Sequence, residues 1–174
     1  MEKWTVDTNH SQVQFRVKHL GIANVAGTFK TFKGEVQTEN EDFNPAEISF
    51  EIEAASLDTK LEERDNFLKS PQFLDIQNFP KILFTGILKR DSGKDEIEGE
   101  LTIRDTKRIV KLEAEFTGIG QGRFNDIRAG FEVTGKINRK DFGLTFNIFT
   151  EAGSLVIGEE VKLHFDIELI KQTN

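Results

Sequence analysis

Hydrophobic and polar residues alternate along most of this chain with a period of two. In the stretch Val13–His19 the odd-numbered residues are Val, Phe, Val and His, whereas Gln, Arg and Lys lie between them. Successive side chains of a β-strand point to opposite faces, so such a stretch has one apolar and one polar face. The same alternation recurs in the segments 25–36, 48–54, 81–89, 96–103, 109–117, 128–137 and 160–170.

This pattern predicts an all-β protein with about eight strands. One wet face per strand is typical of antiparallel sheets, and the sequence lacks the regular strand–helix alternation of parallel folds. We therefore expect an antiparallel β-barrel, in which Trp4–Val6 forms a short edge strand. An interior of this size is filled by side chains or holds one small ligand.

One stretch, 54–84, interrupts the strand pattern and predicts a helical insert that covers the barrel. Thr59 and Glu62 have the spacing of a capping box at a helix start, and Ser70-Pro71 resembles a second start. The periodicity leaves two interpretations open. The insert is either a crossover helix that plugs one end of the barrel or a lid over a ligand cavity.

Composition and charge narrow the function classes. The 174 residues fit one domain, 1–174. The formal net charge of -7, from 23 Lys and Arg against 30 Asp and Glu, gives no electrostatic basis for nucleic-acid binding. The 16 Phe residues, with no Tyr and no Cys, indicate a dry apolar interior without thiol chemistry. The sequence shows no signal peptide and no apolar run of membrane-spanning length, which predicts a cytoplasmic protein, or a periplasmic or secreted one if a signal peptide was removed.

The titratable residues do not form a recognisable catalytic or metal-binding motif. The three histidines, His10, His19 and His164, have no close spacing, so we expect neither a metal site nor a cofactor. No serine has a nucleophile-elbow context and no carboxylate pair is placed for acid–base work, so no catalytic residue is assigned. His19 falls on an apolar strand face, where its imidazole would need a partner inside the barrel.

Several ordered motifs between Trp4 and Leu169 together resemble the YceI-like family of bacterial proteins. They are DTNHS at 7–11, VKHLGI at 17–22, ASLDT at 55–59, RDNFLKSPQF at 64–73, FPKILF at 79–84, GELTI at 99–103 and INRKDFGL at 137–144. The resemblance implies a lipocalin-like barrel that holds a long isoprenoid or a similar amphiphilic lipid, with homodimers among relatives and binding in place of catalysis. The family usually has histidine at the position of Phe67, so the insert here is more apolar and favours the lid interpretation.

The expected site is an apolar cavity with a few polar contacts. Its predicted lining is Phe15, Val17, His19, Phe29, Phe50, Ile52, Phe67, Leu68, Phe84, Leu101, Phe116, Phe131 and Phe165. The predicted polar contacts are His19, Arg64, Asp65 and Arg139. Two alternatives remain: a filled barrel that serves stress response or protein interaction without a lipid, and an enzyme that acts on the lipid.

Overall fold

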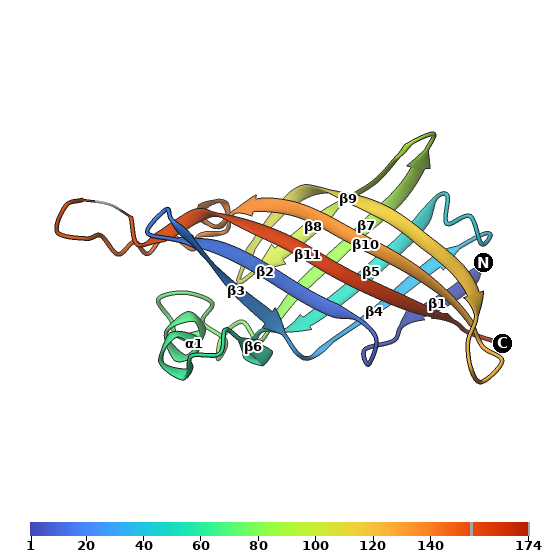
Figure 1. The fold of residues 1–174 in the computed structure, drawn as a ribbon, viewed down its shortest axis with the longest axis horizontal. Coiled ribbons are helices and arrows are strands. Elements are labelled where there is room, and N and C mark those ends of the chain that lie inside the picture. Colours follow the sequence, from blue (N-terminus) through green and yellow to red (C-terminus); the bar gives the residue numbers. More distant parts are fainter. Residues whose placement is uncertain (154, 174) are drawn as a thin grey trace.

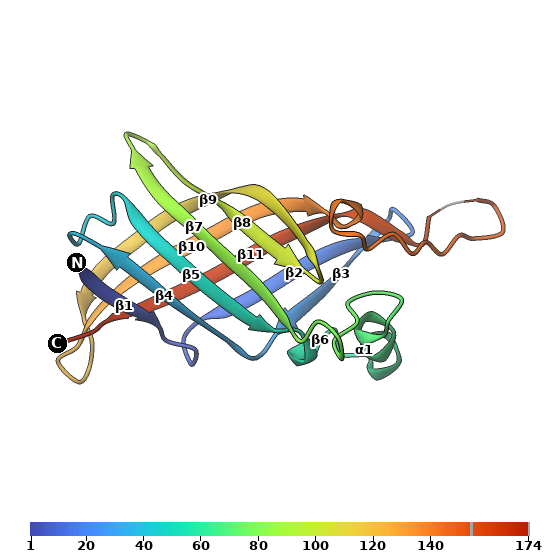
Figure 2. The ribbon, with the colours of Figure 1, turned by 180° about the vertical axis from the view of Figure 1, so that it is seen from behind.

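The computed structural model describes residues 1–153 and 155–173, and its strands form a single antiparallel sheet rolled into a barrel (Figures 1 and 2). The strands are β1 (Glu2–Val6), β2 (Gln12–His19), β3 (Ala23–Phe29), β4 (Phe32–Thr38), β5 (Ala46–Glu53), β6 (Leu57–Asp58), β7 (Lys81–Asp91), β8 (Lys94–Ile103), β9 (Thr106–Gln121), β10 (Ile127–Asn138) and β11 (Ile157–Lys171). The predicted antiparallel barrel with one helical insert is confirmed.

Eight strands of the described chain close a ring in the order β1-β4-β5-β7-β8-β9-β10-β11, and β11 pairs back to β1. The long strand β11 makes this possible, because one half of its edge pairs with β1 and the other half with β2. The prediction that Trp4–Val6 is an edge strand is therefore wrong. Trp4 pairs with Val36 on one side and Lys171 on the other, and its side chain is fully buried.

The insert contains the short 3-10 helix η1 (Ala54–Ser56), β6 and one α-helix, α1 (Glu62–Lys69), followed by turns up to the start of β7. The predicted capping box is wrong: α1 begins after Leu61, and no side chain caps it. Thr59 instead donates its backbone N–H and its hydroxyl to Asp65. The predicted second helix start at Ser70 is also wrong, because this residue ends α1.

The barrel core is divided into two hydrophobic clusters, one toward each end. The first contains Trp4, Phe43 and Phe131, and it lies at the end where both chain termini are found (Figure 1). Phe43 comes from the loop between β4 and β5, is fully buried, and packs 4.9 Å from Trp4 and 5.1 Å from Phe131 between ring centroids. We call this the floor cluster.

The second cluster lies at the opposite end, beside the insert. It contains Phe73 and Leu74 from the insert, together with Phe142 and Leu144, which follow β10 through the 3-10 helix η2 (Arg139–Phe142). We call this the lid cluster. No residue of α1 itself is buried, so the helix lies over this end without being part of the core. Among the described helices, none is long and apolar enough to cross a bilayer.

Candidate functional site

A cavity of about 110 Å³ lies where the floor cluster meets the lid cluster. Its wall is apolar except for Glu35, whose half-exposed carboxylate pairs with Lys3 at 3.0 Å. The lining residues are Val6, Glu35, Val36, Phe43, Ile48, Phe50, Ile52, Ile82, Leu83, Phe84, Leu88, Ile97, Leu101, Val110, Leu112, Phe131, Val133, Leu163, Phe165, Ile167 and Leu169. Such a wall offers hydrocarbon contact, and its one carboxylate, Glu35, is ion-paired with Lys3.

Glycines on the inner face keep this space open by letting phenylalanine rings lie flat on the wall. Phe50 lies over Gly34, where a Cβ atom would be 2.5 Å from its Cδ2. Phe84 lies over the directly paired Gly86 and Gly99, where a Cβ atom would be 2.7 Å and 2.6 Å from its Cζ. A larger residue at Gly34 would have to displace the Phe50 ring, whereas at Gly86 and Gly99 it would also meet the backbone oxygens of Glu98 and Thr85, because real Cβ contacts are essentially never this short.

Six of the predicted cavity residues line this space: Phe50, Ile52, Phe84, Leu101, Phe131 and Phe165. Six others do not: Phe15, Val17, Phe29, Phe67, Leu68 and Phe116. The alternation places most of them correctly on the inner face, but neighbouring rings occupy the space they face. Phe15 lies over Gly27 and packs 5.5 Å from Phe29, beside the lid cluster. Phe116 packs 5.1 Å from Phe131, in the floor cluster.

His19 also lies outside the cavity, and the expectation that its imidazole is inside an apolar barrel is wrong. It is the last residue of β2 and is exposed. It alternates in phase with Val13, Phe15 and Val17, but β2 continues past the barrel core. Periodicity alone does not show where along a strand the core ends.

Arg64 and Asp65 form local hydrogen bonds around Thr59, at the start of α1. The Arg64 guanidinium donates to the Thr59 hydroxyl at 2.7 Å and to its carbonyl at 2.6 Å. The Asp65 carboxylate accepts from the Thr59 N–H at 2.9 Å and its hydroxyl at 2.5 Å. Neither residue lines the cavity. Together they fix the entry of the chain into α1.

Arg139 is 1% exposed, and all five of its N–H groups are used within the protein. Nε donates to the Gly158 carbonyl at 2.9 Å, and Nη2 donates to the Ile157 carbonyl at 3.2 Å and to the Asn147 side-chain oxygen at 2.8 Å. Nη1 donates to the carbonyls of Leu144 and Phe146, at 2.6 Å and 3.1 Å. Burial lowers the pKa of this guanidinium. With no donor left, Arg139 joins the two stems of the segment 144–158 and does not face a ligand.

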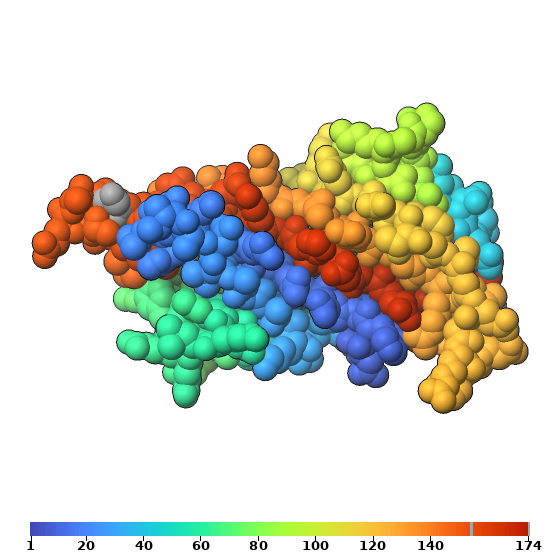
Figure 3. Space-filling view, in the orientation of Figure 1, coloured from blue at the N-terminus to red at the C-terminus, as the bar shows by residue number. Residues whose placement is uncertain are grey.

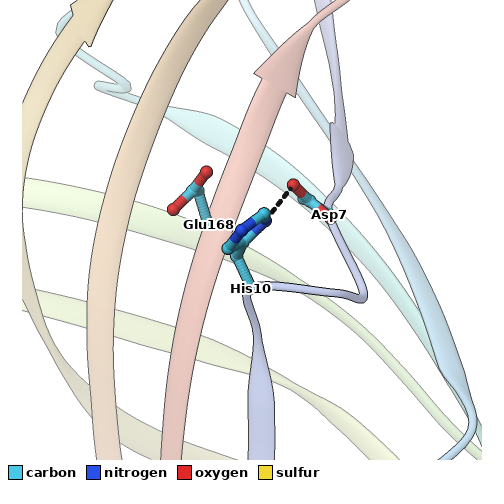
Figure 4. A group of neighbouring side chains, drawn as sticks. All are labelled: Asp7, His10 and Glu168. Atoms are coloured by element: carbon cyan, nitrogen blue, oxygen red, sulfur yellow. Dashed lines mark hydrogen bonds and ion pairs between the residues drawn. The ribbon is translucent and has the colours of Figure 1, made fainter. Parts of the chain in front are cut away.

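The fold also brings Glu168 close to Asp7 and His10, which lie near the other end of the sequence (Figure 4). The His10 Nδ1 lies 2.7 Å from the Asp7 carboxylate. Arg128 occupies the middle of the group, because it donates to Asp7 at 2.7 Å, to Asp126 at 3.0 Å and to Glu168. A metal cation would have to displace this guanidinium, so the group acts as an ion-pair network.

This network shifts the pKa of two of its members. Burial acts to raise the pKa of Asp7, but hydrogen bonds from His10 and Arg128 outweigh it and hold the pKa below its ordinary value of 3.8. Hydrogen bonds to Glu168, Asp126 and Asp7 raise the pKa of Arg128.

A second group, Glu132, His164 and Asp166, lies on the solvent-exposed outer face of the barrel, with the His164 Nε2 3.2 Å from the Glu132 carboxylate.

A family model described as the YceI-like domain matches residues 4–169, almost the whole chain. The chain belongs to the YceI-like family. Among its YceI-like relatives is the protein YceI of Salmonella arizonae, 36% identical over 164 residues, which cover 94% of this chain and 83% of the relative. The solved YceI protein of Campylobacter jejuni is 27% identical, with a TM-score of 0.70 and 90% coverage of both chains.

A more distant neighbour shares the fold of this YceI-like barrel at 14% sequence identity. It is a domain from Saccharophagus degradans that is described as polyisoprenoid-binding and implicated in plant cell wall breakdown. The TM-score is 0.73, and the match covers 97% of this chain and 98% of the domain. At this identity the likeness is one of fold alone.

Sequence reasoning missed two features of the YceI-like barrel that shape its cavity. One is the role of the inner-face glycine: the sequence marks Gly34 as a point of close approach, but not that the Phe50 ring lies over it, although its alternation with Phe32 and Val36 identifies it as an inward position without a side chain. The other is Phe43, the apolar residue of an otherwise polar turn segment, TENEDFNP at 38–45. An apolar residue in such a turn is a signal that the turn folds back onto the core.

Proposed function

We propose that this YceI-like barrel binds an isoprenoid-like or other long-chain amphiphilic lipid in its apolar interior, and carries or sequesters it without chemical change. The observation that carries this proposal is the cavity between the two core clusters, whose wall is hydrocarbon almost throughout. Family membership and the polyisoprenoid-binding description of the Saccharophagus degradans domain add support.

The lining determines what kind of ligand fits. A wall without free donors rewards only hydrocarbon, at about 0.8 kcal/mol per buried CH2 before ordering costs. A polar head group would leave its hydrogen-bonding needs unmet inside, so it stays at an end of the barrel. The floor cluster fills one end, which leaves the lid end for the head group.

The lid is the element that would move during loading. No residue of α1 is fully buried, and the apolar surface that its displacement would expose is mainly that of Phe67 and Leu68, which are half-buried against the lid cluster. Its main contacts are aromatic: Phe67 lies 5.4 Å from Phe146 and 6.1 Å from Phe73 between ring centroids. A hydrocarbon chain can replace an aromatic contact of this kind more readily than it could replace a buried ion pair.

The size of the cavity favours a second candidate, a filled barrel that binds no lipid. A volume of about 110 Å³ is below the roughly 300 Å³ typical of small-molecule pockets. A long lipid therefore requires inner side chains to shift. Phe50 and Phe84 are only partly buried, so their rings have room to move.

Native mass spectrometry of the purified protein, before and after addition of a polyprenol, tests the proposal. We expect one lipid per barrel, recovered chemically unchanged. Phe131→Trp adds bulk at the cavity wall and should reduce uptake, whereas Phe29→Trp is the matched control because Phe29 lies outside the cavity. Failure of the folded parent to take up any added lipid would support the filled barrel, and recovery of an altered lipid would indicate an enzyme. The homodimer implied by the resemblance stays a prediction.

A further inference from the structure

The end of the barrel beside the lid carries exposed apolar side chains on two adjoining projections. The first is the turn between β2 and β3, where Leu20 is 37% exposed and Ile22 is 83% exposed. The second consists of residues 147–153 and 155–157, with Ile148 and Phe149 exposed. The two are joined, because the Leu20 N–H donates to the Val156 carbonyl at 2.9 Å. We call them together the apolar tip, and they project from the same end in Figures 1 and 3.

Leu20 has a backbone conformation in the β2–β3 turn that is unfavourable for leucine, so its presence there needs an explanation other than turn formation. Leu20 and Gly21 both have positive φ, 53° and 71°, and the Ile22 N–H returns to the His19 carbonyl at 3.2 Å. Two-residue hairpin turns with two positive φ values strongly prefer Asn-Gly. Leu20 is 37% exposed, so its burial offsets this strain only in part, and the neighbouring Ile22 is almost fully exposed.

The strands behind the apolar tip are basic, although the protein as a whole is acidic. Between Thr8 and Gly34 the chain has four Lys or Arg residues and no Asp or Glu, against a formal net charge of -7 overall. Two of the four, Lys30 and Lys33, are ion-paired with Asp58 and Glu51, which leaves Arg16 and Lys18. Arg16 and Lys18 are exposed, and neither forms an ion pair or hydrogen bond with any described residue.

Like charges also lie side by side on this face. Arg16 pairs directly with Lys162 across β2 and β11, and Lys162 pairs with Lys136 across β11 and β10. Like charges directly opposite each other destabilise a sheet. Among the neighbouring acids, Glu159 pairs with Lys140 at 2.8 Å, Glu160 pairs with Lys136 at 3.9 Å, and Glu151 is exposed within the tip segment itself. None of them forms an ion pair with Arg16, Lys18 or Lys162 in the part of the chain that the structure describes.

We propose that the apolar tip inserts into the surface of a bilayer that contains anionic lipid, with Arg16, Lys18 and Lys162 contacting the head groups. Exposed apolar side chains backed by unpaired basic residues are the combination that binds such surfaces. Docking in this orientation brings the lid end of the barrel to the membrane. The proposal goes beyond the proposed function, and it would stand even if the cavity bound no lipid.

Vesicle flotation tests this, with one set of vesicles made of phosphatidylcholine and phosphatidylglycerol and another of phosphatidylcholine alone. We expect the parent protein to bind the mixed vesicles and to be released by salt. Leu20→Asn/Ile22→Ser should weaken binding by about tenfold or more, and it keeps the fold because Asn suits the turn. Arg16→Gln/Lys18→Gln should weaken it similarly, through charge alone.

Phe124→Ser is the matched control, because Phe124 is 81% exposed in the turn between β9 and β10, at the other end of the barrel. Equal loss of binding in this variant, or no loss in the tip variant, would overturn the proposal. Failure of the parent protein to bind the mixed vesicles would also overturn it. This includes the case in which sedimentation shows that the apolar tip mediates self-association instead. Vesicle binding with no polyprenol uptake would refute only the proposed function, and uptake without vesicle binding would refute only the docking.

Discussion

Replacing the buried Arg139 by methionine should destabilise the whole protein, and the structure sets the size of the effect. The side chain is 1% exposed and donates five hydrogen bonds. Hydrogen bonds to a charged group contribute about 1.5–3 kcal/mol each, but they are not additive, and burial of the charge offsets part of the gain. Methionine removes the charge together with its donors and leaves the oxygens that Arg139 satisfies without a partner, at about 1–3 kcal/mol for each buried group, so we expect a total loss of about 3–5 kcal/mol for Arg139→Met.

Urea unfolding monitored by circular dichroism measures this loss in the free energy of unfolding. In thermal unfolding, at about 2–4 °C per kcal/mol, the melting temperature should fall by roughly 6–20 °C. Arg139→Lys keeps the charge but has three donors, so it should lose about half as much. The exposed Arg123→Met serves as the control and should change stability by less than about 0.5 kcal/mol.

Amide hydrogen exchange separates the structural role of Arg139 from a ligand contact. The substitution should remove protection first in the segment 144–158, whose two stems the guanidinium joins. If Arg139→Met instead lowered lipid uptake and cost less than about 1 kcal/mol of stability, the hydrogen-bond argument would be refuted. The side chain would then contact a ligand, as the sequence motif led us to expect.

Two further predictions concern Asp7 and Gly34. Because the folded pKa of Asp7 is below 3.8, its ionised form stabilises the fold above about pH 4, and this contribution is lost as the pH falls through the lowered value. Asp7→Asn should therefore cost about 1–2 kcal/mol at pH 7 and progressively less in acid, as measured by urea unfolding at each pH. Gly34→Ala should push Phe50 into the cavity and reduce polyprenol uptake in native mass spectrometry, whereas Gly27→Ala, whose Cβ would press on a ring outside the cavity, should not. If the stability loss of Asp7→Asn did not change with pH, the argument about Asp7 would be wrong. If both alanine variants took up the same amount of polyprenol, the argument about Gly34 would be wrong.

The barrel was predictable because its signal is local. Alternation with a period of two is written into each strand, and it assigned inner and outer faces correctly to both Phe15 and Phe131. Which of these residues borders empty space was not predictable from the pattern. That depends on which ring lies over which glycine across strands, as Phe50 does over Gly34.

For the polar residues, too, the sequence identified which side chains are used but not what they contact. The motifs singled out Arg64, Asp65 and Arg139, and all three do form several hydrogen bonds. Their partners, however, are backbone groups and the side chains of Thr59 and Asn147, and none of them lines the cavity. A motif shows that a charged side chain is used, but its partner is known only when the chain around it is placed.

The buried Phe43 fills the end of the barrel at which the chain termini lie. A lipid bound as proposed, with its head group at the lid end, would enter and leave through the lid end, so its tail would go in first and its head group would come out first. The distance from the lid cluster to the Phe43 ring then limits the length of the tail that fits. Shortening this side chain, as in Phe43→Ala, would increase that distance and shift the preference toward longer chains.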